Sequence, residues 1–286
     1  MKSHKRKKTI YYSDPLHDDF AGTKIVTESV DEHFPFAHKS IFWRVVAFFA
    51  YYFFAVPIVF LYTHIVMGLR IRGASALRKT KGGVFLYGNH TQMLDPFIPP
   101  MISFPRRAYT IANADAVSIR GIRQLVLMIG GLPLPTKLSG MRKFNEAVQT
   151  HIDRHSIISI YPEAHIWPYY TGVRPFEDKS FGYPVKMNRP VCAMATTYRK
   201  RLFLKRPRIV VHVSRPFYPD PEKSTAQNRA ALRTAVYDFI REKCGNDNYE
   251  YIHYEYRPVC SEQKFDVKNH VENIKKDGKE ENVSSL

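Results

Sequence analysis

A stretch of 23 residues without Asp, Glu, Lys or Arg, from Val45 to Met67, constrains the fold of this chain more than any other feature. A helix needs about 20 apolar residues to cross a bilayer, so the stretch is long enough. Eight of its residues are Phe or Tyr, and it begins too far into the chain for a secretory signal peptide. We therefore predict a membrane-associated helical segment over residues 41–69 and favour it over a buried core helix.

Two features bear on how this segment meets the membrane. Pro57 lies in its middle and is expected to kink or break a helix. Basic residues lie on both sides, with Lys39 and Arg44 before it and Arg70 and Arg72 after it, whereas a single span usually carries its positive flank on the cytoplasmic side. A single span and a hairpin that enters one leaflet and returns both stay open, and the two positive flanks favour the hairpin slightly.

The overall charge and the cysteine content narrow the class of protein. The 286 residues include 43 Lys and Arg against 26 Asp and Glu, a formal net charge of +17, so an anionic partner is expected. The basic residues are dispersed and no nucleic-acid module signature is present, so we expect membrane lipids and no nucleic acid as partners. Cys192, Cys244 and Cys260 lack Cys-x-x-Cys spacing, which argues against a disulfide framework or zinc knuckle and fits a reducing cytosolic setting.

Strand and helix patterns alternate after the apolar segment, which predicts an α/β fold with a mostly parallel central sheet flanked by helices. Strands are expected at 71–77, 84–87, 156–161, 191–197 and 209–213, and helices at 141–154 and 226–243. The chain then divides into a polar flexible arm (1–40), the membrane-associated helix or helical hairpin (41–69), a main domain (70–260) and a disordered charged tail (261–286).

The strongest candidate site follows the apolar run 84–87, where a buried strand is expected to end. Asn89 and His90 stand there, with four residues between His90 and Asp95. A neutral imidazole can take a proton from an alcohol, and a carboxylate can orient the ring and stabilise the imidazolium. Pro96 suits a first helical position, so Asp95 is a plausible N-cap. Because sites in open α/β folds gather at the carboxyl ends of strands, we predict a proton-handling site here.

Four blocks stand in order along the main domain: Asn89-His90 to Asp95, Gly131 to Thr136, Ile160 to Ile166, and Arg189 to Ala195, with Pro175-Phe176…Lys179 between the last two. In this order they resemble the PlsC-type glycerolipid acyltransferases. The first block is similar to that family's Asn-His-x4-Asp, the second to Gly-x-x-Phe-Ile-x-Arg and the third to Phe-Pro-Glu-Gly-Thr-Arg. The fourth matches the apolar strand of the last motif, and the stretch before it resembles Pro-Phe-Lys-Lys-Gly.

The resemblance implies a membrane-bound acyltransferase, with residues 70–260 as its catalytic domain on the cytoplasmic side. It would move a fatty acyl group from acyl-CoA or acyl-carrier protein to a glycerol hydroxyl of a lysophospholipid, either lysophosphatidic acid or a related lipid. His90 would be the general base, aligned by Asp95, and Asn89 would hold the loop or donate to a developing oxyanion. Pro162 and Glu163 would lie beside the acceptor. No metal and no cofactor besides the acyl co-substrate would be needed.

The chain departs from the family pattern where the acceptor phosphate is usually gripped. Thr136 stands at the place of the second-block Arg, with Lys137 next to it, and His165 lies in the third block, which lacks both Gly and Arg. A bidentate Arg is the strong reader of phosphate, and Lys only a point charge. Either Lys137, Arg174 and Lys179 take over the phosphate, or the head group differs. His165 could be a second catalytic or acceptor-binding group, or a packed loop histidine.

Two further stretches carry open interpretations. Residues 199–208 include six Lys and Arg residues. They could form a solvated hairpin loop, or a patch that binds anionic lipid or the phosphates of CoA, and we favour binding to lipid. His151 and His155 have helical spacing, but without the glutamate of a His-Glu-x-x-His site they are expected at a solvated helix end.

Two other functions compete: a non-catalytic basic protein that binds membrane or nucleic acid, and a lipid hydrolase. The hydrolase would need a Gly-x-Ser-x-Gly elbow, which is absent from the sequence.

Overall fold

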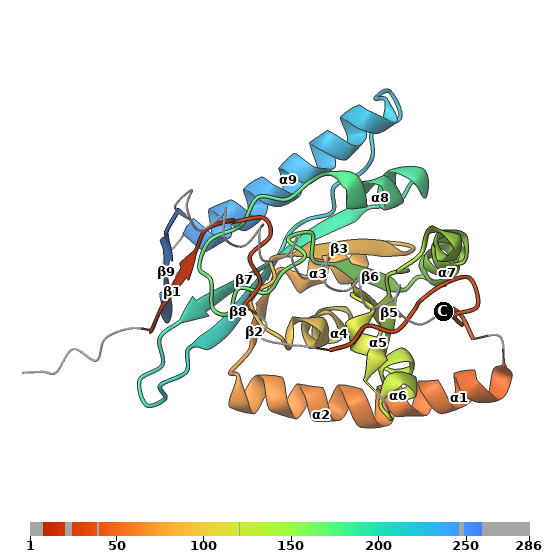
Figure 1. The fold of residues 1–286 in the computed structure, drawn as a ribbon, viewed down its shortest axis with the longest axis horizontal. Helices are drawn as coiled ribbons and strands as arrows, with labels where there is room; N and C mark the ends of the chain where they lie inside the picture. The colour runs from red at the N-terminus through yellow and green to blue at the C-terminus, as the bar shows by residue number, and fades with distance from the viewer. Residues whose placement is uncertain (1–7, 21–24, 39, 120, 246–248, 259–286) are drawn as a thin grey trace, which may run out of the picture.

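The computed structural model describes residues 8–20, 25–38, 40–119, 121–245 and 249–258. Its centre is a sheet with the strand order β2-β8-β7-β3-β6-β4-β5 (Figure 1). The strands are β2 (Arg70–Arg72), β3 (Val84–Gly88), β4 (Ala108–Ala112), β5 (Gly131–Pro133), β6 (Ile157–Ile160), β7 (Val191–Arg199) and β8 (Arg208–Val213). Only β7 and β8 pair in the antiparallel sense; all other neighbours in this sheet are parallel. The expectation of a mostly parallel central sheet is confirmed.

Helices cover both faces of this sheet and give it two apolar cores. One face packs against α7 (Met141–Asp153), α8 (Gly182–Lys186) and α9 (Thr225–Gly245), and the other against α3 (Ala74–Lys79) and α4 (Ile98–Ser103). Two further short helices, α5 (Asp115–Ser118) and α6 (Arg123–Met128), flank β5. Single turns of 3₁₀ helix lie at Asp95–Phe97, Leu138–Gly140 and Lys179–Phe181. Helices on both faces explain why the strands read as nearly continuous apolar runs.

Strand β3 is the element that positions the candidate site. All five of its residues are buried, with Phe85 and Tyr87 in the core beneath α7 and α9, and Val84 and Leu86 in the core on the opposite face. Neighbouring strands β6 and β7 hold it from both sides. Its carboxyl end therefore delivers the following residues, Asn89 and His90, to a fixed point at the edge of the sheet.

The strand predicted at 71–77 is wrong beyond residue 72. Gly73 takes a left-handed conformation with φ of 81°, which glycine adopts without steric cost. A Cβ at this position would also collide with the backbone of Val213. The chain turns there, and the following Ala-Ser-Ala-Leu-Arg-Lys, rich in good helix formers, becomes α3.

The apolar segment forms one continuous helix, so of the two alternatives left open by the sequence the structure has the helix and not the slightly favoured hairpin. It runs from Ile41 to Val66 without reversal and is long and apolar enough to cross a membrane. Only 11% of its most apolar stretch is buried against the rest of the protein. Its parts are α1 (Ile41–Phe49), a π-helical stretch (Ala50–Ala55), α2 (Val56–Leu61) and a second π-helical stretch (Tyr62–Val66). Val56 N–H donates to the Tyr51 carbonyl, five residues back. This wider turn accommodates Pro57, which lacks an N–H and would crowd a regular helix.

The helix lies lengthwise against the domain and does not project from it (Figure 1). Ala47, Tyr51 and Thr63 are buried on the inner side. Ala108 N–H donates to the Tyr51 hydroxyl at 3.0 Å, and the Tyr52 hydroxyl donates to the Pro105 carbonyl at 2.9 Å. The outer side exposes a continuous series of large apolar residues, among them Phe42, Phe49, Phe53, Phe54, Ile58 and Ile65.

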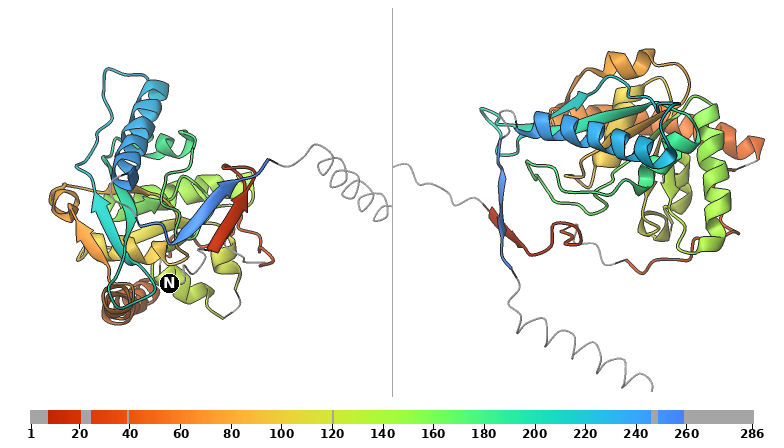
Figure 2. Two further views of the ribbon diagram at one scale, coloured as in Figure 1. Left: turned by 90° about the vertical axis from the view of Figure 1, so that its left-hand side faces the viewer. Right: turned by 90° about the horizontal axis from the view of Figure 1, so that it is seen from above.

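The N-terminal segment, predicted as a polar flexible arm, contacts the domain in both of its described stretches. Strand β1 (Lys8–Tyr12) pairs in parallel with β9 (Ile252–Tyr256), and the two lie side by side, apart from the main sheet (Figure 2). Val30 and Phe36 are buried in the core beneath α7. This packing was missed because its partners come from remote parts of the chain. The predicted tail 261–286, Lys39 and Cys260 lie outside the described residues.

Candidate active site

His90 and Asp95 form a hydrogen-bonded pair at the carboxyl end of β3. The Nδ1 atom of His90 lies 3.0 Å from Oδ2 of Asp95. The Asp95 side chain is fully buried, whereas that of His90 is 13% exposed. A carboxylate on Nδ1 favours the neutral tautomer with its proton on that nitrogen, which leaves the Nε2 lone pair free to accept a proton. Nε2 has no partner within the described part of the chain.

The Asp95 carboxylate accepts hydrogen bonds from the loop that precedes it and does not cap a helix. Its Oδ2 atom accepts the N–H groups of Thr91 at 2.7 Å and Gln92 at 2.8 Å, in addition to His90. Asp95 is itself the first residue of a 3₁₀ turn that continues into α4, so the N-cap expectation is wrong. Three donors on one oxygen hold this buried carboxylate in place and thereby fix the imidazole that it faces.

Glu163 and Arg174 form a second buried pair directly behind His90. One Glu163 oxygen accepts His90 N–H at 3.2 Å and Arg174 Nε at 3.3 Å, and the other accepts Arg174 N–H at 3.0 Å. Burial raises the pKa of the Glu163 carboxyl, and the Arg174 guanidinium opposes that rise. Arg174 also donates to the carbonyls of Glu163 and His165. The pair thus fixes the backbone of His90, and Arg174 has its donors engaged internally instead of facing an acceptor phosphate.

Asn89 is bound to the backbone of β7. Its amide donates to the Thr196 carbonyl at 3.0 Å, and its oxygen accepts Thr196 N–H at 2.8 Å. The amide nitrogen also donates to the Cys244 sulfur at 3.7 Å. Both ends of the amide are therefore engaged within the protein, which fits the loop-holding alternative rather than donation to an oxyanion. Pro162 lies between the buried strand β6 and Glu163 and is partly exposed.

The remaining predicted binding residues are spread along the rim. Thr136 exchanges hydrogen bonds with the backbone of Val30, and Lys137 lies 3.8 Å from Asp31 with 62% of its side chain exposed. Since β5 is three strands away from β3, this position is about 14 Å from the His90 strand. Lys179 is 81% exposed and paired with Glu177. The structure therefore does not bring these two lysines together with Arg174.

His165 lies at the edge of the third block, next to the N-terminal segment. Its Nδ1 atom is 3.8 Å from Asp19, and its N–H donates to the Glu163 carbonyl. The preceding residue, Ala164, has φ of 63°, a conformation that favours glycine. The turn that glycine serves in the family pattern is thus formed here by alanine.

Two tyrosines at the site were not singled out from the sequence. The Tyr161 ring stacks on the His90 imidazole with centroids 4.6 Å apart, and its hydroxyl donates to the Asp95 carbonyl at 2.6 Å. The Tyr198 hydroxyl donates to the hydroxyl of Thr91 at 2.7 Å. Their place at the ends of the predicted strands 156–161 and 191–197 is the signal that could have identified them.

Comparisons with known proteins bear on the family and the fold of this chain. Residues 68–197, which include β2 to most of β7 and the whole His90 loop, match the family model described as Acyltransferase. The fold is similar to that of PlsC from Thermotoga maritima, a 1-acyl-sn-glycerophosphate (LPA) acyltransferase, with a TM-score of 0.50 and 14% sequence identity. The similarity covers 73% of this chain and 98% of that one. No curated protein matches the sequence.

Proposed function

We propose that this chain is an acyltransferase of the PlsC type, which transfers a fatty acyl group from acyl-CoA or acyl-carrier protein to a glycerol hydroxyl of a lysophospholipid. The observation that carries the proposal is the His90–Asp95 pair, which presents a free Nε2 at the carboxyl edge of the sheet inside the matched family region. The match to the Acyltransferase family model supports this proposal over the alternatives of a non-catalytic basic protein and of a lipid hydrolase.

In the proposed reaction His90 handles the proton. Nε2 accepts the proton of the acceptor hydroxyl as its oxygen attacks the thioester carbonyl, and the new ester bond forms as the carbon–sulfur bond breaks. The imidazolium then returns the proton to the departing thiolate. The Asp95 carboxylate stabilises the imidazolium between these two steps through the 3.0 Å contact to Nδ1. No acyl-enzyme is required, and no metal or other cofactor enters the scheme.

Glu163 acts in this scheme as a positioning residue. Its contacts go to the backbone of His90 and to Arg174, and it is buried. Glu163 and Arg174 keep the imidazole in place while Asp95 sets its tautomer. A misplacement of about 1 Å in such a group can reduce the rate about 10²-fold, so rigid support behind the histidine is part of the catalytic design.

The acceptor is held by contacts other than the family's second-block arginine. The cations of that region pair with acidic residues of the N-terminal segment: Lys137 with Asp31, and Arg123 with Glu28. Since Arg174 is also committed to Glu163, we propose an acceptor whose head group differs from that of plain lysophosphatidic acid bound in the usual way.

We propose further that the enzyme rests on one leaflet of a membrane, with its catalytic domain on the cytoplasmic side. The helix 41–66 exposes its apolar side along its whole length, about 39 Å at 1.5 Å per residue, while its other side is docked on the domain. The β7–β8 hairpin projects beside the end of this helix (Figures 1 and 2), and Ile209 N–H donates to the Met67 carbonyl. Leu202, Phe203 and Leu204 form its exposed tip between basic residues, a composition that suits an anionic lipid surface.

The catalytic proposal is tested with purified protein in neutral detergent, labelled acyl-CoA and acyl-carrier protein, and a panel of lysolipids. Wild type should transfer acyl groups to at least one lysolipid, and His90→Ala should be slower by about 10²–10⁴-fold. His155→Ala, a change at an exposed helix end, is the matched control and should keep the rate. Equal product from wild type and His90→Ala would reject the mechanism.

The membrane proposal is tested by flotation with vesicles. Phe53→Asp on the helix and Phe203→Asp on the hairpin tip each remove an exposed aromatic group and add a charge, so each should weaken binding about tenfold or more. Leu138→Asp changes an equally exposed residue outside both surfaces and should bind like wild type. If all three variants float equally with wild type, this membrane face is wrongly assigned.

A further inference from the structure

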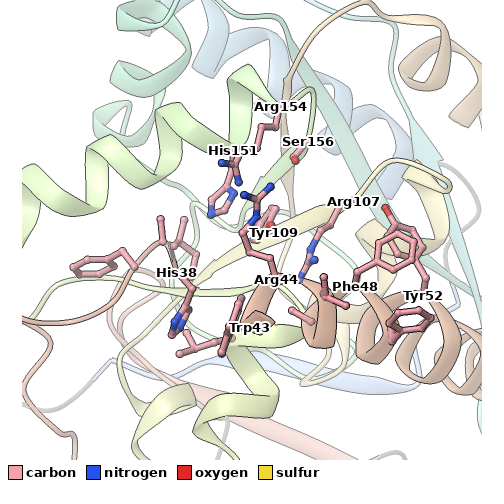
Figure 3. Close-up of a pocket in the computed structure, with 18 of the residues that line it drawn as sticks. His38, Trp43, Arg44, Phe48, Tyr52, Arg107, Tyr109, His151, Arg154 and Ser156 are labelled. Atoms are coloured by element: carbon pink, nitrogen blue, oxygen red, sulfur yellow. The ribbon is translucent and has the colours of Figure 1, made fainter. Parts of the chain in front are cut away.

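A cavity lies at the amino ends of the sheet's strands, whereas His90 lies at their carboxyl ends. It has a volume of about 530 Å³ and opens between α1, the start of β4 and the end of α7 (Figure 3). Arg107 precedes β4 and Ser156 precedes β6, so both line the cavity from the amino ends of their strands. From Ser156 to Tyr161, which stacks on His90, the extended chain covers about 16 Å. The cavity is therefore separate from the candidate active site.

Three arginines from three different elements converge on this cavity. Arg44 comes from α1, Arg107 from the turn before β4, and Arg154 from the end of α7 (Figure 3). All three lie close enough to the Tyr109 hydroxyl to lower its pKa, against a larger rise caused by burial. Among the described residues that line the cavity there is no Asp or Glu. Three positive charges thus face one space without an acidic neighbour in its wall.

The donors of this cluster are only partly used within the protein. Arg107 donates through one terminal nitrogen to the Met128 carbonyl and lies over the rings of Tyr51 and Tyr109, while its Nε has no partner in the described chain. For Arg44 and Arg154, the described residues provide no side-chain hydrogen bond or ion pair. Arg107 Nε is a buried donor without a partner, which is costly, whereas the side chains of Arg44 and Arg154 are exposed. An anion in the cavity could accept hydrogen bonds from all three arginines.

His151 lines the same cavity beside Arg107 and Arg154. The sequence suggested a solvated helix end, but His151 is buried, its ring stacked on Tyr109 with centroids 3.8 Å apart. Its Nδ1 atom has no partner in the described chain. Burial, reinforced by Arg107 and Arg154, lowers the pKa of His151 to about 3.

The opposite wall of the cavity is apolar and belongs to the membrane-facing helix. Val45, Phe48 and Phe49 from α1 line it and are also exposed on the outer side of that helix. The cavity therefore joins a cationic end inside the domain to an apolar surface that, under the proposed membrane orientation, contacts lipid chains. A lipid with a phosphate head group and two acyl chains has the same division of charge and apolar surface.

We propose that this cavity binds the phosphate head group of an anionic membrane phospholipid, held by Arg44, Arg107 and Arg154, with the acyl chains leaving along Val45, Phe48 and Phe49. Arginine suits phosphate because its planar fork can donate two parallel hydrogen bonds. The site would fix the height and rotation of the domain on the leaflet. This inference rests on the proposed membrane orientation but not on the acyl-transfer mechanism.

The test uses the full chain in neutral detergent and a soluble short-chain lipid, dihexanoyl phosphatidylglycerol, in a calorimetric titration. Phosphatidylglycerol is chosen because its head group carries one net negative charge, on the phosphate. Dihexanoyl phosphatidylcholine, with the same phosphate but no net charge, and inorganic phosphate are the comparison probes. Wild type should bind phosphatidylglycerol at one site, at least tenfold tighter than either comparison probe.

The variants Arg44→Gln and Arg154→Gln remove exposed guanidinium groups, so the fold is expected to survive. Combined, they should weaken phosphatidylglycerol binding at least tenfold, whereas Arg142→Gln, an equally exposed change earlier on α7, should not. Unchanged binding in the double variant, or equal binding of phosphatidylcholine, would overturn the proposal. Tight inorganic phosphate binding would show a free-anion site instead of a lipid site, and would overturn it too.

A second readout separates this site from the catalytic one. His90→Ala should bind phosphatidylglycerol like wild type, and the pKa of His151, followed by NMR of its imidazole, should rise when the lipid is bound. Loss of lipid binding in His90→Ala would place the lipid at the active site and refute a separate site. Loss of acyl transfer alone in that variant bears on the proposed function and leaves this inference intact.

Discussion

The two edges of the sheet, at the carboxyl and the amino ends of its strands, differ in how their charged groups are paired. At the carboxyl edge, Asp95 is bound to His90 and to two backbone N–H groups, and Glu163 is matched by Arg174. At the amino edge, three arginines and His151 meet without a carboxylate in the cavity wall. Internal pairing makes the first set rigid, which suits the placement of a general base. Because the arginines of the second set have no acidic partner in the cavity wall, they can bind an anionic ligand.

The largest effect is expected where internal pairing is broken. Arg174→Met leaves the buried Glu163 carboxylate without its cation, which should cost about 3–5 kcal/mol of folding free energy. Denaturant unfolding measures the loss. The double variant Glu163→Gln with Arg174→Met removes the stranded charge and should recover part of it. A single variant as stable as wild type would show that the pair is not needed to compensate buried charge.

The next effect tests the charge of Asp95 apart from its hydrogen bonds. All three donors meet the same oxygen, so Asp95→Asn can keep them through its amide oxygen and lose only the negative charge. We expect kcat to fall about 10²-fold with KM nearly unchanged, because the imidazolium is no longer stabilised. Steady-state kinetics on folded protein measure this, and an unchanged kcat would assign Asp95 to orientation alone.

At the amino ends of the strands, His151 should make the stability of the protein depend on pH. His151 has a folded-state pKa of about 3, lowered from 6.5. The unfolded chain therefore binds the extra proton first, so stability is complete above about pH 6.5 and is lost as the pH falls toward 3. At pH 5 the loss is about 2 kcal/mol. The groups that face this ring are Arg107, Arg154 and the stacked Tyr109, and Arg44 in turn acts on Tyr109.

Unfolding curves of wild type and His151→Phe between pH 4 and 7 check this expectation. The aromatic replacement keeps the stacking on Tyr109 but cannot take up a proton, so its curve should lack this part of the slope. Bound phosphatidylglycerol should flatten the wild-type slope as well. Equal slopes for wild type and variant without lipid would show that His151 is not the group that titrates.

The smallest effects are expected at the exposed lysines of the carboxyl edge. Lys137 and Lys179 form surface ion pairs, which contribute about 0–1 kcal/mol. Lys137→Ala and Lys179→Ala should therefore change kcat/KM for any accepted lysolipid by less than about fivefold. If kcat/KM for lysophosphatidic acid instead fell 10²-fold or more, one of these lysines would bind the acceptor phosphate. Lysophosphatidic acid would then be the acceptor, bound in the usual way.

Local patterns in the sequence were sufficient to predict several parts of the molecule. The alternation of strands and helices, the apolar helix and the place of His90 after β3 all follow from periodicity and from turn residues next to each other in the chain. Errors arose where a backbone conformation decided the outcome, as when Gly73 ended β2 early and when π-helical turns carried the helix past Pro57.

The sequence by itself determined the type of sheet, the length and apolar character of the 41–66 helix, and the order of the blocks that mark an acyltransferase, because each depends on neighbours within a few residues. Only the tertiary structure decided the partners of the charges. Arg174 turned inward to Glu163, Thr136 met Val30 from the N-terminal segment, and Arg44, Arg107 and Arg154 converged from three elements. Such pairings depend on which elements pack together across long distances in the chain, and no local pattern encodes that choice.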